Sequence, residues 1–442
     1  MKRGRFLLGI DVGSSSIKAA LLDVESGSVV ASAQSPEKEL PIIAQQQGWA
    51  EQHPETWWEH AKKATALLAA QGNASLRDVC AVGISYQMHG LVMVDKSNTP
   101  LAPSIIWCDS RSVEIGNRAF DAIGPQQCLG RLLNSPGNFT ASKLRWVQEN
   151  QPQIYREIHK IMLPGDYLAL KLTGEVRTTP SGLSEGILWD YQDHSLSKLV
   201  LDHYEIDEKL IPETVPTFSI QGVITPQAAA ELGVNAGTPL SYRAGDQPNN
   251  ALSLNVLNPG ELAATAGTSG VVYGVTDQPS YDPQSRVNTF VHVNYRRETP
   301  RYGVLLCVNG TGILNSWIRQ ACSAGGMLLK YSEMDRIAGQ APVGCAGLTI
   351  LPYGNGAERT LVNRDLRASI HGLSFTTHTQ AHLLRAVQEG IVFALNYGVE
   401  IMRTMGIRIE KIRAGNANMF MSSLFCEAFA AVTGATVELY DT

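Results

Sequence analysis

The chain has 442 residues, of which 44% are hydrophobic, and a formal net charge of −5. At about 150 residues per domain this length predicts two to three domains, enough to bury a substantial core. Lysine and arginine are scattered along the chain rather than gathered, which argues against a nucleic-acid-binding protein and against a basic membrane-surface helix. No apolar run reaches the roughly 18 residues that a membrane-spanning helix needs.

The seven cysteines are odd in number and form no C-x-x-C pair. This usage predicts free, buried thiols in a reducing compartment, and it argues against a disulfide framework or a zinc site. We therefore expect a cytoplasmic protein that binds neither nucleic acid nor membrane.

Strand-like and helix-like segments alternate along the chain, which is typical of the α/β class. In the first half the hydrophobic pattern predicts strands over 7–12, 17–22 and 79–85 and helices over 57–70, 142–149 and 165–172. The first two strands flank Gly13-Ser14-Ser15-Ser16, so they are expected to form a hairpin with a turn of small residues.

The same plan appears again in the second half of the chain. Strands over 260–265 and 270–275 flank Ala266-Gly267-Thr268-Ser269, a second small-residue turn. We therefore place a domain boundary at residue 243, with domains over 1–243 and 244–442. A long helix over 380–405 and strands over 409–413 and 435–440 follow. The last strand stops two residues before the end of the sequence, so we expect this domain to continue beyond residue 442.

Several common catalytic motifs are missing from the sequence. It contains no G-x-x-x-x-G-K-[ST] loop, no G-x-G-x-x-G after a strand, no H-E-x-x-H and no G-x-S-x-G. These absences disfavour a Walker-type ATPase, a dinucleotide-dependent dehydrogenase, a zinc protease and an α/β-hydrolase.

Both small-residue turns suit a phosphate group. In the first, Asp11 ends a strand and Gly13-Ser14-Ser15 offers unobstructed backbone N–H groups and hydroxyls. The Asp11 carboxylate suits Mg²⁺, a hard cation that usually binds through water. The turn at 266–270 has similar small residues and unobstructed donors but lacks an acidic residue. Ordinary hairpin turns are the alternative for each, and the occurrence of one turn in each half makes phosphate binding an equal alternative.

Asp246 lies between a predicted strand that ends at Gly245 and a helix that begins near Pro248. The helix dipole stabilises a carboxylate there, and such a group can accept a proton from a substrate hydroxyl. A simple helix cap is the alternative. The polar strings Gln87-Met88-His89-Gly90 and Trp107-Cys108-Asp109-Ser110-Arg111 suit a sugar or polyol, with a structural histidine and a surface ion pair as the alternatives.

These strings, in this order, resemble the FGGY family of carbohydrate kinases, part of the sugar kinase–actin–Hsp70 ATPase superfamily. Besides those quoted, the matching strings include Leu163-Pro164-Gly165-Asp166-Tyr167-Leu168, Leu351-Pro352-Tyr353 and Gly356-Ala357-Glu358-Arg359-Thr360. The resemblance runs through nearly the whole chain. It implies two ribonuclease-H-like α/β domains around a central cleft, with the sugar on the first domain and the nucleotide on the second.

The resemblance also implies roles for single residues. Asp246 would be the catalytic base toward the terminal hydroxyl of the sugar. Asp11 would be the second catalytic residue, an acidic side chain that binds Mg²⁺ through water. The implied sugar contacts are Gln87, Met88, His89, Trp107, Asp109 and Gln247. The implied ATP contacts are Gly13, Ser14, Ser15, Lys18, Gly267, Thr268, Ser269, Gly312, Ser316, Gly415, Asn416 and Asn418.

Within the family, Gln87-Met88-His89-Gly90 resembles the xylulokinases. This implies phosphorylation of D-xylulose to D-xylulose 5-phosphate, with ATP and Mg²⁺ as cofactors and a homodimer as a possible assembly. Gln247 resembles glycerol kinases instead, so kinases for glycerol, gluconate, L-ribulose or a seven-carbon ketose stay open as alternatives. An actin- or Hsp70-like nucleotide switch is the alternative from another class, and the strings at 87–90 and 107–111 argue against it.

Overall fold

The structure is a computed structural model that describes residues 5–72, 74–323 and 327–441, and the chain forms two compact units. Unit 1 consists of Met1–Asn249 with Val291–Arg297, and unit 2 of Asn250–Phe290 with Glu298–Thr442. The predicted boundary at residue 243 therefore differs from the observed division. The difference has a structural cause, because residues 239–245 form a strand of the sheet of unit 1 and the chain leaves that unit only afterwards.

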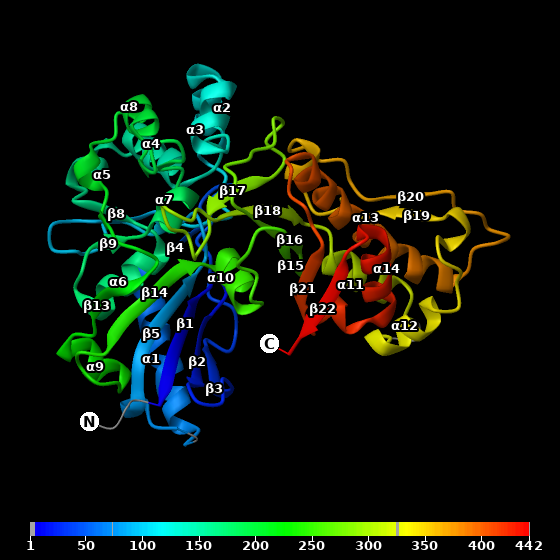
Figure 1. Cartoon of the computed structure of the whole chain (residues 1–442), viewed down its shortest axis with the longest axis horizontal. Helices are drawn as coiled ribbons and strands as arrows, with labels where there is room; N and C mark the ends of the chain where they lie inside the picture. The colour runs from blue at the N-terminus through cyan, green and yellow to red at the C-terminus, as the bar shows by residue number, and fades with distance from the viewer. Residues whose placement is uncertain (1–4, 73, 324–326, 442) are drawn as a thin grey trace. The chain divides into compact units, whose positions relative to one another are not determined.

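Unit 1 is built on a six-stranded sheet of order β13-β14-β5-β1-β2-β3 (Figure 1). Its strands are β1 (Phe6–Val12), β2 (Ile17–Asp23), β3 (Val29–Ser35), β5 (Val79–Tyr86), β13 (Phe218–Val223) and β14 (Pro239–Gly245). The strands β1, β5 and β14 are parallel, and β2, β3 and β13 run antiparallel to their neighbours. The predicted first hairpin is confirmed as β1 and β2.

Unit 2 is built on a second six-stranded sheet, of order β17-β18-β16-β15-β21-β22. Its strands are β15 (Glu261–Ala266), β16 (Gly270–Thr276), β17 (Asn288–Val291), β18 (Tyr302–Val308), β21 (Lys411–Gly415) and β22 (Thr436–Tyr440). The run β18-β16-β15-β21-β22 has the same strand directions as β3-β2-β1-β5-β14. The repeated plan inferred from the two small-residue turns is thus a repeat of sheet topology, and the fold is a two-domain α/β fold.

Helices cover the sheets within each unit. In unit 1, α1 (Pro54–Ala70) packs on β2 and β3, α6 (Pro164–Thr173) packs on β5 and β14, and α9 (Pro226–Leu232) contacts both helices. In unit 2, α13 (Gln380–Thr404) packs on β16 and β18 between α11 (Gly312–Ala321), α12 (Tyr331–Ala338) and α14 (Ser423–Thr433). The predicted long helix is therefore confirmed, whereas the strand expected over 409–413 begins at Lys411, where its pairing with β15 starts.

The remaining elements are short. The other helices are α2 (Val113–Ile123), α3 (Pro125–Leu132), α4 (Thr140–Asn150), α5 (Pro152–Glu157), α7 (Pro180–Glu185), α8 (Lys198–Tyr204) and α10 (Asp246–Ser253). Two-stranded pairs are formed by β4 (Glu51–Gln52) with β7 (Ser104–Ile105), β6 (Val92–Val94) with β8 (Lys160–Met162), β9 (Arg177–Thr178) with β12 (Glu213–Thr214), β10 (Trp189–Asp190) with β11 (Ser195–Leu196), and β19 (Thr349–Leu351) with β20 (Ser369–His371).

Each unit has its own hydrophobic core. Alternate residues of β1, namely Phe6, Leu8, Ile10 and Val12, are buried, as the period of two in a strand requires. They pack with Trp57 and Ala61 of α1 in the core of unit 1. In unit 2 the buried face of α13 packs against β16, β18 and α14. Burial of these faces is the main stabilising contribution to each unit.

The structure tests the predictions of free, buried cysteines and of no membrane-spanning helix. All seven cysteines are free, as predicted, but only Cys128 and Cys345 are buried and Cys108 is exposed. Cys108 departs from the prediction because it follows Trp107 in a loop at the surface of unit 1. In the part of the chain that the structure describes, no helix is long and apolar enough to cross a membrane.

Candidate active site

Three neighbouring strands of unit 1 end at the same level. Val12, the last residue of β1, pairs with Tyr86, the last of β5, and Tyr86 pairs in turn with Gly245, the last of β14. Ligands of open α/β sheets bind at this carboxyl edge of parallel strands. Because the strands end together, the residues that come next in sequence, including Gln87 and Asp246, begin at this one edge.

The turn between β1 and β2 is tight and carries Asp11 beside it. The N–H of Gly13 donates to the carbonyl of Ser16 at 3.1 Å, and a Cβ on Gly13 would stand 2.9 Å from that oxygen. The turn therefore requires a glycine at position 13. The Nζ of Lys18 lies 3.9 Å from Oδ2 of Asp11, and both side chains are partly exposed. Ser15 is also exposed, so the turn offers donors to solvent.

Asp246 is the first residue of α10, directly after β14, as the sequence predicts. Burial and the negative charge of Asp11 raise the pKa of Asp246 to about 7, although a hydrogen bond from the N–H of Gln247 opposes the change. A carboxylate with this pKa accepts a proton readily near neutral pH. The two acids also lie close enough for their charges to repel, so the structure brings the two predicted catalytic residues together.

The segment Gln87–Gly90 follows β5 and is held by contacts on several sides. Gln87 is 3% exposed, its Nε2 donates to Oε1 of Gln52 at 3.3 Å, and its own Oε1 has no hydrogen-bond partner in the structure. Met88 packs against Gly245, where an added Cβ would stand 2.6 Å from its Cγ. This contact places the segment beside the strand that leads into Asp246.

His89 and Glu185 form a pair that the sequence did not predict. Nδ1 of His89 lies 2.8 Å from the carbonyl oxygen of Glu185, and the N–H of His89 donates to Oε2 of Glu185 at 3.3 Å. Glu185 ends the short helix α7, and no motif or spacing in the sequence marks it. Burial raises the pKa of Glu185 well above its ordinary value, with the charge of Asp246 acting in the same direction.

Trp107 and Asp109 differ in position although they share one loop. The Trp107 side chain is 51% exposed and its Nε1 donates to Oγ of Ser14 at 3.3 Å, which joins it to the first turn. Asp109 is fully buried, and its carboxylate accepts hydrogen bonds from Arg111 and from the N–H of Ala50. Of the two predicted sugar contacts in this loop, Trp107 is accessible and Asp109 holds the loop from inside.

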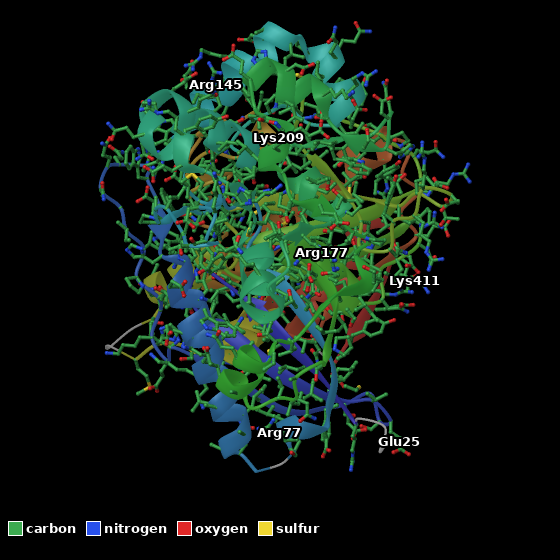
Figure 2. The ribbon with its side chains drawn as sticks, turned by 90° about the vertical axis from the view of Figure 1, so that its left-hand side faces the viewer. Glu25, Arg77, Arg145, Arg177, Lys209 and Lys411 are labelled. Carbon is green, nitrogen blue, oxygen red and sulfur yellow. The ribbon has the colours of Figure 1, made fainter. Side chains whose placement is uncertain are left out.

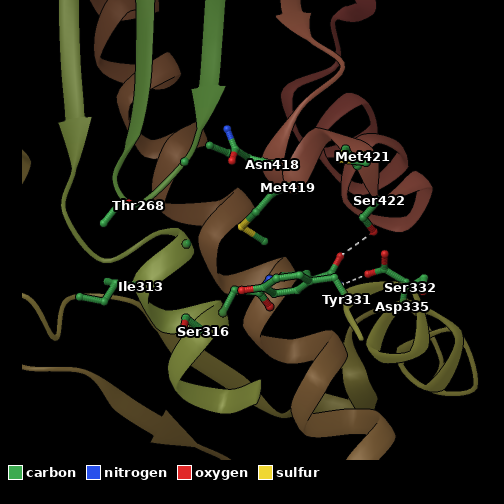
Figure 3. Close-up of a pocket in the computed structure, with 15 residues that line it drawn as sticks. Thr268, Ile313, Ser316, Tyr331, Ser332, Asp335, Asn418, Met419, Met421 and Ser422 are labelled. Carbon is green, nitrogen blue, oxygen red and sulfur yellow. Dashed lines mark hydrogen bonds between the residues drawn. The ribbon is translucent and has the colours of Figure 1, made fainter. Parts of the chain in front are cut away.

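Unit 2 contains a cavity of about 680 Å³ next to its small-residue turn (Figure 3). Five predicted ATP contacts line it, namely Gly267, Thr268, Gly312, Ser316 and Asn418. Three others, Ser269, Gly415 and Asn416, are not among the lining residues. Side chains that the sequence did not predict complete the wall, namely Ile313, Asn315, Tyr331, Ser332, Asp335, Gln388, Met419, Met421 and Ser422.

Backbone contacts join the turn to the start of α11. The N–H of Gly312 donates to the carbonyl of Gly267 at 2.9 Å, and that of Ile313 donates to the carbonyl of Thr268 at 3.2 Å. A Cβ on Gly312 would collide with the Gly267 carbonyl, so position 312 requires a glycine. The N-terminal end of a ten-residue helix thereby lies against the turn, and helix N-termini favour phosphate groups.

The wall of the cavity has a polar and an apolar part. Nε2 of Gln388 donates to Oδ1 of Asp335 at 2.7 Å, and Oγ of Ser422 donates to Oε1 of Gln388 at 3.1 Å (Figure 3). Ile313, Met419 and Met421 supply apolar surface. A flat heterocycle with polar edges suits such a wall.

Comparison with known proteins decides between the classes that this geometry allows. The N-terminal domain of the FGGY family of carbohydrate kinases matches residues 6–253, and its C-terminal domain matches residues 262–442. The chain belongs to the FGGY family of carbohydrate kinases. The resemblance found in the sequence is therefore confirmed, and this FGGY kinase is an ATP-dependent sugar phosphotransferase.

Individual relatives of this FGGY kinase agree with the family match. A xylulose kinase of Haemophilus influenzae is 30% identical over 417 residues, which cover 92% of this chain and 81% of the relative. A solved structure from Brucella ovis, described as a "xyloylose kinase", superposes with a TM-score of 0.87 at 27% identity over 99% of this chain and 87% of its own. A gluconate kinase from Lactobacillus acidophilus has the same TM-score at 23% identity over 98% and 85%, which shows a shared fold.

Proposed function

We propose that this kinase transfers the γ-phosphoryl group of ATP to the terminal hydroxyl of D-xylulose, which gives D-xylulose 5-phosphate. The observation that supports this most directly is the packing of Met88 against Gly245, because it sets the segment Gln87–Gly90 beside Asp246. The relatives named xylulose kinase, at about 30% identity over most of this chain, support the same sugar.

In this proposal unit 1 binds the sugar and Asp246 serves as the general base. The substrate hydroxyl gives its proton to the Asp246 carboxylate, its oxygen forms a bond to the γ-phosphorus, and the bond to the β,γ-bridging oxygen breaks to release ADP. Gln247 follows the base, the buried amide oxygen of Gln87 has no hydrogen-bond partner, and His89 and Trp107 are at least partly exposed. Asp109 acts indirectly, by holding the loop that carries Trp107.

The nucleotide belongs in unit 2 in this proposal. The cavity of about 680 Å³ would take the base and ribose of ATP against Ser316 and Asn418. The phosphates would lie at Gly267 and Thr268, beside the N-terminal end of α11. Gly13, Ser14, Ser15 and Lys18 are proposed phosphate contacts too. Ser269, Gly415 and Asn416 stay predictions, since they are not among the residues that line the cavity.

The residues present at the first turn fit a magnesium ion. Asp11 is partly exposed, its ion pair with Lys18 is long at 3.9 Å, and its charge raises the pKa of Asp246. A divalent cation would relieve that repulsion. Mg²⁺ is usually held by one or two carboxylates and retains waters and phosphate oxygens as its other ligands, so the single Asp11 carboxylate suits it. Bound Mg²⁺ would neutralise charge on the transferring phosphoryl group.

A sugar panel with ADP release as the readout tests the proposal. We expect D-xylulose to give a kcat/KM at least about tenfold above glycerol, gluconate, L-ribulose and a seven-carbon ketose, a difference of roughly 1.4 kcal/mol. Gln247 favours the second candidate, a kinase for glycerol or another polyol. If one of those substrates gives the higher kcat/KM, D-xylulose is not the preferred substrate, although the kinase activity itself is supported. If no sugar stimulates ADP release, the proposed function is overturned.

Two further predictions belong to this proposal. We expect the kinase to act in the cytoplasm. We also expect it to form a homodimer, and light scattering coupled to gel filtration tests this oligomeric state. A monomer at micromolar concentration would contradict the second.

A further inference from the structure

The helix α4 contacts both segments that the proposed function assigns to the sugar. Oγ1 of Thr140 donates to the carbonyl of Gly90 at 3.3 Å, in the first segment. The Trp146 ring lies under the guanidinium of Arg111, with 4.8 Å between the guanidinium carbon and the ring centroid, in the second. The helix therefore touches the segments after β5 and after β7 with residues from successive turns.

Lys143 lies between these two contacts and joins the segments directly. Its side chain is fully buried, and its Nζ donates to the carbonyl of His89 at 2.7 Å and to the carbonyl of Ile106 at 3.0 Å. His89 precedes Gly90, and Ile106 precedes Trp107. One amino group thus ties the backbone beside His89 to the backbone beside Trp107.

The backbone at His89 needs such support. Its φ is +61°, in the left-handed region, which costs a residue with a side chain about 1–3 kcal/mol. The next residue, Gly90, has no room for a Cβ, which would stand 2.6 Å from Cγ of Pro164. A strained turn that packs against α6 needs surrounding contacts to keep its conformation. Lys143 supplies one of these contacts, because its amino group binds the carbonyl of His89.

The buried amine can make these two bonds in either protonation state. Burial lowers the pKa of Lys143 to about 7, and the charge of Asp109 opposes that change. A neutral amine has two N–H donors and an ammonium has three, and the two carbonyls need only two. Burying an amine is expensive, so its presence here calls for a role that an apolar side chain of similar length would not fill.

We propose that Lys143 is a positioning residue for the sugar, which holds the His89 and Trp107 segments at a fixed separation. This inference rests on the proposed function, because that function assigns both segments to the sugar. Lys143 lies beneath the segments and would not contact the substrate.

Unit 1 contains a matched control. Nζ of Lys160, on β8, also donates to two backbone carbonyls, those of Lys209 at 2.7 Å and Ile211 at 3.0 Å (Lys209 is labelled in Figure 2). Lys160 ties together segments that the proposed function does not assign to the sugar. Lys143→Met and Lys160→Met therefore remove the same kind of link from the same unit.

The experiment measures KM for D-xylulose and for ATP, together with amide hydrogen exchange, in the wild type and both variants. We expect Lys143→Met to raise the KM for D-xylulose about tenfold or more and to leave that for ATP within about twofold. Exchange should become faster over 87–91 and 105–111. Lys160→Met should leave both KM values and both exchange rates within about twofold.

Each result supports or overturns the inference. If exchange over both segments is unchanged in Lys143→Met, Lys143 does not hold them and the inference is overturned. If exchange quickens while the KM for D-xylulose stays the same, the link is structural only, which also overturns it. If the wild type phosphorylates no sugar, the proposed function fails, and the exchange result still decides whether Lys143 holds the segments. If Lys143→Met does not fold, Lys143→Gln replaces it in the same measurements, because the glutamine side chain is one atom shorter and should not reach both carbonyls, so the same outcomes apply.

Discussion

The hydroxyl of Tyr86 donates a hydrogen bond of 2.5 Å to Oε1 of Glu185 in the interior of unit 1. Tyr86 ends β5 and Glu185 ends α7, so this bond fixes the short helix to the sheet at the level where Asp246 begins. Oε2 of the same carboxyl lies near Gly245 and accepts the N–H of His89. One buried carboxyl group therefore supports the backbone on both sides of the proposed sugar site.

We predict that the stability of unit 1 does not depend on a negative charge at Glu185. Because burial raises the pKa of Glu185 well above its ordinary value and so disfavours the ionised form, Glu185→Gln should cost about 1 kcal/mol of stability or less. Glu185→Ala leaves the Tyr86 hydroxyl without a buried partner and should cost about 2–4 kcal/mol. Urea unfolding measures both. Equal losses in the two variants would show that the fold uses the ionised form.

Removal of the general base should abolish phosphoryl transfer. We expect Asp246→Asn to lower kcat about 10²–10⁴-fold, with the Kd for ATP within about threefold of the wild type. Turnover with D-xylulose and calorimetry with ATP measure the two quantities. A variant that retains wild-type turnover would remove Asp246 from the role of base.

The pH profile offers an independent test of the same residue. A base acts when it is deprotonated, and the pKa of Asp246 is about 7, so kcat/KM should fall about tenfold per pH unit below pH 7 and level off above it. The charge of Asp11 contributes to that raised pKa. Without Mg²⁺, the Asp246 carboxyl should therefore titrate at a lower pH in Asp11→Asn than in the wild type, which NMR of the carboxyl carbon measures, and an unmoved titration would contradict the coupling.

Asp109 separates a structural role from a binding role. Asp109→Asn weakens one of the two carboxylate partners of Arg111, whose side chain is only 1% exposed and keeps its ion pair with Glu51 at 2.7 Å, so we expect a loss of about 1–3 kcal/mol of stability. We expect a large drop in the midpoint of thermal unfolding rather than a selective rise in the KM for D-xylulose. A stable variant with a raised KM would restore Asp109 as a direct sugar contact.

Gly312 tests the nucleotide site in unit 2. In Gly312→Ala the new Cβ meets the Gly267 carbonyl, so the turn at 266–270 must shift and the KM for ATP should rise about tenfold or more. Gly339→Ala is the control in the same unit, because its Cβ would have ordinary clearance, 3.4 Å from the nearest atom. Similar kinetics in both variants would argue against a role of this turn in binding ATP.

Local features of the chain were predictable from sequence. A short apolar run predicted β1 and alternating apolar residues predicted β2, both correctly. The small-residue turns marked both sheets because each lies between two adjacent strands. Asp11 and Asp246 were found for the same reason, since each adjoins the end of one strand. Short-range patterns of this kind depend on backbone geometry that neighbours in sequence determine.

Residues that distant segments bring together were not predictable. Glu185 reaches His89 only through the packing of α7, and Lys143 reaches it only through the packing of α4. Tyr331 and Gln388 line the cavity of unit 2 from two different helices. Nothing in their local sequence distinguishes such residues from ordinary helix positions, and the burial of Asp109 likewise depends on Arg111 and the backbone of Ala50.

The alignment of Val12, Tyr86 and Gly245 at the ends of three parallel strands separates two properties of the enzyme. Asp11 lies near the end of β1 and Asp246 comes directly after β14, the outer strands of this trio, whereas the segment Gln87–Gly90 follows the middle strand. Evolution can therefore replace the recognition loop without displacing the groups that carry out the transfer. Enzyme engineers can use the same freedom, by exchanging residues 87–90 together with the helix that braces them.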